Sequence, residues 1–234
     1  MSDCPARRRT PPSALRSAAR RLHDRWETLF FVIVYLLLSL QVYCFYFNTQ
    51  SLAGLHGAIA AFATLESFVA SRLTYVILPQ VLTPLAYLFL CFKRPPWWRI
   101  YLDILGVYVV LRMAIQLIGL NILVFDSTTS KFLLITQLLF FLPYSLLVWG
   151  WIYWRLDTPG RKRLRPLFRF DFEGETPRPI DYFVASFSSV FSASINTIKG
   201  NSARARLLIL AHGFLIYDVM GLTLSRAVAL VQSR

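Results

Sequence analysis

Charged side chains inside otherwise apolar segments are the residues of this chain most able to do chemistry. Arg112 sits within the run VYVVLRMAIQLIG, with Gln116 one helical turn later on the same face. A charge at the bilayer centre costs about 2.5–3.5 kcal/mol on insertion scales, so such residues face the bundle interior and pair with one another. We therefore predict an intramembrane charge network, with Arg112 paired to Asp218 or to Glu66. Its members are Glu66, Arg112, Asp218 and Arg226.

This network has two interpretations, a structural ion pair that locks a helical bundle or an ion path or gate. Arg112 alone does not resemble a voltage sensor, which uses an arginine-rich helix. His212 is a candidate pH sensor, because an unperturbed imidazole titrates near neutral pH. The alternative for His212 is a hydrogen bond to a neighbouring helix.

An enzymatic function is not expected. Ser192, His212 and Asp218 supply the residue types of a nucleophile, a base and an orienting group, but no glycine elbow surrounds the serine. The three cysteines, Cys4, Cys44 and Cys91, have neither metal-ligand nor redox spacing. The sequence therefore predicts no catalytic site, no metal and no cofactor.

The elements that must position these residues are long apolar segments. The runs LFFVIVYLLLSLQVYCFYF and YVILPQVLTPLAYLFLCF, together with residues 100–125 and 132–154, are each long enough for a membrane span of about 20 residues. A soluble helix of that length would show a polar face, and these show almost none. We predict an all-α fold, a polytopic integral membrane helical bundle with five or six transmembrane helices.

The basic residues flank the spans and divide the chain into four parts. Residues 1–28 form a basic cytoplasmic tail with an interfacial helix, 29–154 the transmembrane bundle, 155–180 a basic loop and 181–234 the C-terminal region. The net charge of +13 is concentrated in the tail and loops, as the positive-inside bias produces, and not on a soluble nucleic-acid-binding module. The expected partners are anionic lipid headgroups, bound by Arg20, Arg21, Arg161, Lys162 and Arg163.

The number of spans depends on residues 55–69. With the tail inside, the first span ends outside near Asn48, and 74–92, 101–124 and 132–154 cross in turn, which places the basic loop inside. Residues 55–69 are apolar enough for a marginal extra span, but His56 and Glu66 interrupt them. Because charge favours the first arrangement, we predict that 53–72 is a partly inserted helix on the outer side.

The C-terminal region is rich in hydroxyl groups. Residues 181–198 can just cross a bilayer, or enter it as a half-helix and turn back; a polar turn follows at 199–206 and a last long helix at 207–231. Irregular backbone at membrane depth is tolerated only against protein or water, so a re-entrant segment implies a cavity. The candidate pore-lining residues are Ser189, Ser192, Ser194, Asn196 and Thr197.

Residues 181–231 resemble the pore region of bacterial two-transmembrane-type potassium channel domains, and also bacterial membrane proteins that keep this outline without the filter. The resemblance lies in Asp181-Tyr182-Phe183, in the run ARARLL that opens the last helix, and in the run WIYWRLD that ends the preceding span. It covers the C-terminal third of the chain. It implies an ion channel-like protein of the bacterial inner membrane, a homo-oligomer (a tetramer as a channel) and monovalent cations as the transported species.

The filter is where the chain departs from this family. A potassium filter needs glycines beside an aromatic residue so that successive carbonyls point into the pore, and VFSASINT contains none. We therefore expect a cation pore lined by a Ser/Asn-rich re-entrant segment. The alternative is a non-conducting membrane scaffold or accessory subunit. The charge bias also places Asp181 inside, whereas channels of this family enter their pore helix from outside.

Overall fold

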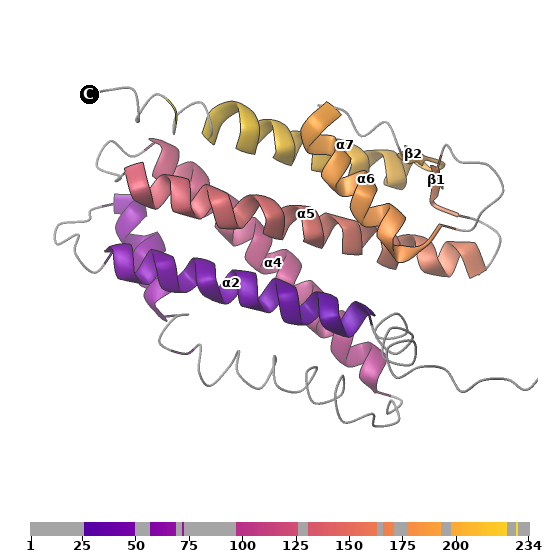
Figure 1. The fold of residues 1–234 in the computed structure, drawn as a ribbon, viewed down its shortest axis with the longest axis horizontal. Helices are drawn as coiled ribbons and strands as arrows, with labels where there is room; N and C mark the ends of the chain where they lie inside the picture. Colours follow the sequence, from indigo (N-terminus) through magenta and orange to yellow (C-terminus); the bar gives the residue numbers. More distant parts are fainter. Residues whose placement is uncertain are drawn as a thin grey trace, which may run out of the picture.

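The computed structural model describes residues 26–49, 57–68, 72, 97–125, 131–162, 166–170, 177–192, 198–223 and 228. This part of the chain is mostly helical (Figure 1). Its elements are α2 (Trp26–Thr49), a helix at Gly57–Phe68, α4 (Trp98–Phe125), α5 (Lys131–Lys162), β1 (Phe168–Phe170), α6 (Pro179–Ser192), β2 (Ile198–Gly200), α7 (Ala203–Tyr217) and the π-helix η1 (Asp218–Thr223).

Three helices are long and apolar enough to cross a membrane, at Trp26–Phe47, Trp98–Phe125 and Phe132–Pro159. A helix satisfies all its backbone hydrogen bonds internally, so an apolar run of this length is stable as a helix in hydrocarbon. These helices indicate an integral membrane protein, and the prediction of a helical membrane bundle is confirmed at that level. The predicted span 74–92 lies outside the described residues.

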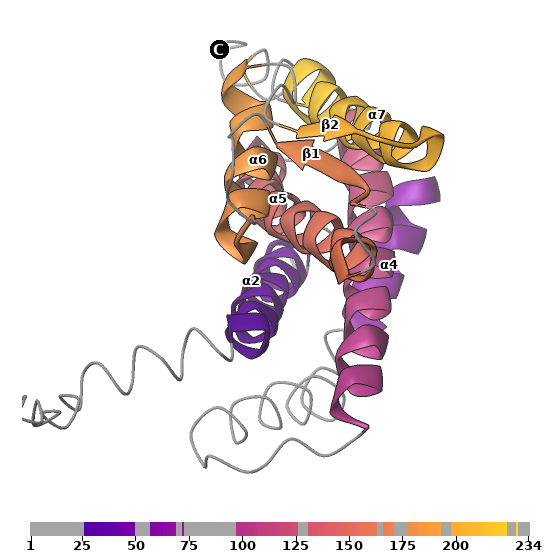
Figure 2. The same ribbon diagram turned by 90° about the vertical axis from the view of Figure 1, so that its right-hand side faces the viewer.

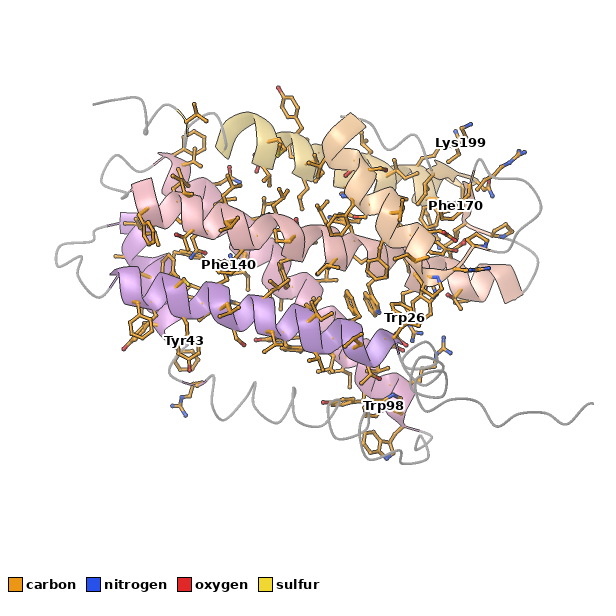
Figure 3. The ribbon with its side chains drawn as sticks, viewed as in Figure 1. Trp26, Tyr43, Trp98, Phe140, Phe170 and Lys199 are labelled. Atoms are coloured by element: carbon orange, nitrogen blue, oxygen red, sulfur yellow. The ribbon has the colours of Figure 1, made fainter. Side chains whose placement is uncertain are left out.

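One end of the bundle gathers the start of α2, the start of α4 and the end of α5. The rings of Trp26 and Trp154 lie 4.4 Å apart, and the Trp151 indole N–H donates to Glu27 over 3.2 Å. Figure 3 shows Trp26, Trp98, Phe170 and Lys199 at this end, with Tyr43 and Phe140 toward the opposite one. We call it the Trp26 end, and the opposite end, where α4 finishes, the Phe125 end.

A two-stranded antiparallel sheet covers the Trp26 end of α5, as Figure 2 shows. Only helices were expected here. The Phe168-Arg169-Phe170 run alternates between buried and exposed side chains, which is the two-residue period of a strand rather than the period of a helix. In the register, Phe168 lies opposite Gly200 and Phe170 opposite Ile198. The strands thus bring together two segments that flank α6.

Two helices extend beyond their predicted limits. α5 continues to Lys162, so the predicted loop 155–180 begins with roughly two more helical turns. α7 begins at Ala203, ahead of the expected start at 207, because the Ser202 hydroxyl caps it by accepting from the Ala205 N–H at 3.2 Å. The turn predicted at 199–206 is therefore partly strand and partly helix.

α6 lies against α5 at very short range. Tyr182 reaches Asp157 near the Trp26 end, and the Ser186 hydroxyl donates to the Leu146 carbonyl oxygen over 2.8 Å. Gly150 permits this approach, because a Cβ there would lie 2.5 Å from the Phe183 ring and 3.0 Å from the Phe183 Cα. A side-chain rotation can move the ring, but it cannot move the backbone atom.

Replacing Gly150 with leucine is therefore expected to push α6 away from α5. The free energy of unfolding in detergent should fall by about 1–3 kcal/mol, the usual cost of overpacking. Gly213→Leu is the matched control, because Gly213 is an exposed helical glycine at which an added Cβ would meet no atom within 4 Å. Thermal unfolding monitored by circular dichroism measures both variants, and equal losses would contradict the close packing.

Candidate functional site

The described charges at membrane depth centre on an ion pair between Glu66 and Arg112. One terminal nitrogen of Arg112 lies 2.9 Å and 3.0 Å from the two carboxylate oxygens. Both side chains are almost fully buried, at 1% exposure for Glu66 and 4% for Arg112. Arg112 comes from the middle of α4, and Glu66 is carried by the short helix Gly57–Phe68. The pair therefore holds that short helix to a spanning helix.

The short helix runs along the second half of α4. A Cβ on Gly119 would lie 1.9 Å from the Phe62 ring, and Phe62 also packs edge-on against Phe45 of α2. Its 12 described residues measure about 18 Å, less than the roughly 30 Å of hydrocarbon. Over the described residues the helix thus reaches from the Phe125 end to the middle of α4.

Three glutamines extend the ion pair across four helices. Gln116 donates to Glu66 over 3.2 Å, and Gln41 donates to the carbonyl oxygens of Gln116 and Gln137 over 2.8 and 3.0 Å. An ionised carboxylate only accepts, so Gln116 must present its amide nitrogen to Glu66 and its oxygen to Gln41. The charge on Glu66 therefore sets the direction of every hydrogen bond in this polar network.

The polar network keeps hydrogen-bonding capacity to spare. Within this network, Arg112 Nε and Gln41 Oε1 are buried without a hydrogen-bond partner among the described residues. Buried polar groups in proteins are nearly always paired with protein or with ordered water. Gln41 and Gln137 were not among the residues expected at this site, although amides inside apolar runs were the available signal.

The other predicted charges do not join the pair. Asp218 begins η1 and accepts from the Asn121 side-chain amide at 2.8 Å, so it bonds to α4 nearer the Phe125 end. Its predicted pairing with Arg112 is not formed, because Asp218 instead lies against Asn121, nine residues further along α4. Arg226 lies outside the described residues. π-Helical turns are common at functional sites, but a single amide contact defines no reaction here.

His212 belongs to α7, and its side chain is fully buried against α5. Its Nδ1 lies 2.9 Å from the Tyr153 hydroxyl, and its ring stacks on Trp149 with centroids 4.8 Å apart. This is the hydrogen bond to a neighbouring helix that was the alternative to a pH sensor. Nε2 has no hydrogen-bond partner among the described residues.

The described serines of α6 bond within the protein. Ser189 is buried and donates to the Ser186 carbonyl over 2.6 Å, while Ser186 bonds to α5 and Ser188 donates to Ala185. Of the remaining pore-lining candidates, Ser192 ends α6 with its side chain outside the described set. Ser194, Asn196 and Thr197 lie wholly outside it.

Asp157, near the end of α5, holds the first turn of α6 in place. Its Oδ1 accepts from the backbone N–H groups of Leu167 and Phe168 over 2.6 and 3.1 Å, and its Oδ2 accepts from the Tyr182 hydroxyl over 2.5 Å. One buried carboxylate thereby joins α5, β1 and α6. Three donors compensate its desolvation, as a buried charge requires. No role for Asp157 was expected from the sequence.

The described part of the chain contains no group of three His, Cys, Asp or Glu residues able to hold a metal. A groove of about 480 Å³ between α2 and α6 is lined only by apolar side chains, among them Trp26, Ile33 and Phe187, and suits hydrocarbon. Arg161 and Lys162 lie at the end of α5 with undescribed side chains, and Arg20, Arg21 and Arg163 lie outside the described residues.

Comparisons of the chain with protein-family models, with curated proteins and with solved structures found no match. Conclusions about function therefore rest on the chain itself.

The Glu66–Arg112 pair predicts a strong energetic coupling. Glu66→Gln leaves a buried guanidinium without its counter-charge and should cost about 3–5 kcal/mol of unfolding free energy. The double variant Glu66→Gln/Arg112→Gln should recover much of that loss, because no net charge is left buried. Chemical denaturation of the four proteins of this double-mutant cycle measures the coupling.

Asp103 and Arg155 provide the control cycle, since they form an ion pair at the Trp26 end in which Asp103 is 46% exposed. Asp103→Asn and Arg155→Gln should couple by less than about 1 kcal/mol. A Glu66–Arg112 coupling no larger than that of this control pair would contradict the role assigned to the buried pair.

Proposed function

We propose that this protein is an ion channel-like integral membrane protein in which α6 is a re-entrant helix. The observation that carries the proposal is the pairing of β1 with β2. β1 follows α5 and β2 precedes α7 in the sequence. Because the two strands pair, the chain enters α6 and returns from it at the same end of the bundle. A segment that enters and leaves a membrane on one side is a feature of channels and transporters.

The length of α6 supports entry without crossing. Its 14 residues measure about 21 Å, and its hydrogen bonds to α5 reach from Asp157 to Leu146, near the middle of that helix. α7 and η1 together cover Ala203–Thr223, about 30 Å at the same rise, and begin at the Trp26 end. Among the described helices we assign crossings to α2, α4, α5 and α7–η1, and the span predicted for 74–92 lies outside the described residues.

Charge supports a cytoplasmic Trp26 end. Of the described basic residues, Arg99, Arg155, Arg169, Arg178, Lys199, Arg204 and Arg206 lie at that end, whereas Lys131 begins α5 at the opposite end. The positive-inside bias then places the N-terminal tail and the start of α6 on the cytoplasmic side of a bacterial inner membrane. This orientation is opposite to that of the potassium channels that the C-terminal region resembles.

The lining is assigned to the residues that follow the buried serines. The Ser186 hydroxyl donates a hydrogen bond to α5, and the Ser189 hydroxyl donates one within α6. We therefore assign the conducting surface to Ser192, Ser194, Asn196 and Thr197. Hydroxyl and amide oxygens there suit a hydrated monovalent cation. The absence of glycine excludes a carbonyl ladder, so the pore is not a potassium filter. One re-entrant helix cannot enclose a pore, and we therefore propose a homo-oligomer, with fourfold symmetry by analogy to the channels.

Cysteine labelling tests the re-entrant path. In a background without Cys4, Cys44 and Cys91, cysteines at Arg178 and Arg204 are expected to react with an impermeant maleimide from one face of the membrane. Phe125→Cys should react from the other face, because α4 ends there with 77% of that side chain exposed. Reaction of positions 178 and 204 from opposite faces would show instead that the segment crosses.

Conduction is tested with purified protein in planar bilayers. We expect cation currents whose conductance or reversal potential changes in Asn196→Leu. Val184→Leu, an exposed position on α6 well before its end, should leave them unchanged. Silence across pH, voltage and common ions would overturn the channel proposal in favour of the membrane scaffold.

A further inference from the structure

The second half of α4 carries a pocket at the Phe125 end of the bundle. Residues at positions i, i+1, i+4, i+5 and i+8 of a helix share one face, and the α4 side chains that line the pocket have this spacing. The helix Gly57–Phe68 contributes Ala58, whose side chain is only a methyl group. The pocket has a volume of about 520 Å³. It is lined by Ala58, Leu117, Ile118, Asn121, Ile122 and Phe125.

Asn121 is the polar residue of this lining, and it connects the pocket to a carboxylate. Its side-chain nitrogen donates to the Leu117 carbonyl oxygen over 3.1 Å and to Asp218 Oδ2 over 2.8 Å. These two bonds use both hydrogens of the amide nitrogen and thereby fix its orientation. Because Asp218 bonds directly to a lining residue, its half-buried carboxylate lies at the edge of the pocket.

Asp218 keeps the capacity to accept a cation. An ionised carboxylate has about four acceptor sites, and Asp218 uses one of them for Asn121. The ion pairs that join two described residues are Glu66–Arg112 and Asp103–Arg155, so no described cation neutralises Asp218. Charged side chains of membrane proteins ordinarily pair with an opposite charge. The pocket thus combines an apolar wall with a negative charge at its edge.

The pocket lies at the level where the hydrocarbon of a bilayer ends. α4 is a candidate span of 28 residues, and Asn121 stands four residues before its end at Phe125. At 1.5 Å per residue, Asn121 is about 14 Å from the midpoint of α4. Half of a hydrocarbon layer measures about 15 Å. A ligand there can keep its charge at the membrane boundary and its apolar body beside Leu117 and Ile118.

We propose that this pocket binds a lipophilic organic cation, with its charge beside Asp218 and its apolar body against α4. Small-molecule pockets of about 300–1,000 Å³ typically combine a mainly apolar lining with a few polar groups. A metal ion needs several oxygen ligands, whereas this lining supplies one amide. A zwitterionic lipid would bring its phosphate toward the carboxylate. The site uses no residue of α6 and therefore stands independently of the proposed pore.

Calorimetric titration of the full chain in phosphatidylglycerol nanodiscs with tetraphenylphosphonium tests the site. Tetraphenylborate has the same shape and the opposite charge, and it should not bind above the level of empty nanodiscs. Asp218→Asn should weaken tetraphenylphosphonium binding by at least about ten-fold, the size expected for a charge pair a few ångströms apart near a protein surface. Asp103→Asn is the matched control, because it removes the same charge at the Trp26 end. Equal affinities of the wild type and Asp218→Asn would overturn the proposal.

Filling the pocket separates its contribution from a general attraction to negative charge. Ala58→Trp should weaken binding about as strongly as Asp218→Asn, because the indole occupies the space of the apolar body. Ala61→Trp is the matched control, since Ala61 is exposed about one turn further along the same helix and does not line the pocket. Circular dichroism verifies that both variants keep their helical content. Equal binding by the two tryptophan variants would show that the pocket is not used and would overturn the proposal.

Three further arms identify the cation that Asp218 holds. Displacement of tetraphenylphosphonium by sodium chloride, and not by N-methylglucamine chloride at equal ionic strength, would show a site for an inorganic cation. Loss of binding in phosphatidylethanolamine nanodiscs alone would assign the pocket to a lipid ammonium group. Arg226 follows η1 and lies outside the described residues. Binding by Arg226→Gln and not by the wild type would assign Asp218 to the chain's own arginine. Each of these three results would overturn the proposal.

Discussion

Hydrocarbon offers a polar group no hydrogen-bond partner, and the placement of polar side chains in this protein follows from that constraint. Glu66 and Arg112 are buried together, and Gln116, Gln41 and Gln137 complete a polar network that joins α2, the helix Gly57–Phe68, α4 and α5. Apolar side chains gain little by leaving lipid for another helix, so hydrogen bonds and close packing must supply specificity. The polar network supplies this specificity in the middle of the bundle, and the close contacts of Gly150 supply it between α5 and α6.

The Trp26 end is organised differently, because there the chain must change direction several times. Asp157 accepts three hydrogen bonds, from Leu167, from β1 and from α6, so a single carboxylate fixes where α6 begins relative to α5. The pairing of β1 with β2 then fixes where the chain returns. In the proposed re-entrant arrangement, α6 would have no second membrane boundary to hold it and would need an anchor where it begins. The sheet and Asp157 would together provide that anchor.

The membrane character and the three long described helices could be predicted from the sequence, because hydrophobic length alone determines them. The involvement of Glu66 and Arg112 could also be anticipated, since an isolated charge in an apolar segment requires a partner, but the choice between Glu66 and Asp218 depended on helix packing. The β1–β2 pair was missed because three residues of alternating pattern carry little signal. Asp157 was missed because its sequence position, at the end of a span, is where an exposed carboxylate is also ordinary. The pore lining predicted for Ser189, Ser192, Ser194, Asn196 and Thr197 stays a prediction.

The proposed pore has to work without the element that gives potassium channels their selectivity. Backbone carbonyls can line a narrow filter in succession only where glycine permits the required conformations, and the segment after α6 has none. Side-chain oxygens on flexible rotamers hold an ion less rigidly and leave more room for its water. The described serine hydroxyls of α6 are moreover hydrogen-bonded within the protein. Any ion selectivity would therefore depend on the residues that follow them. A pore of this construction would pass hydrated cations and discriminate weakly among them, and its properties would depend on how firmly the base of α6 is held.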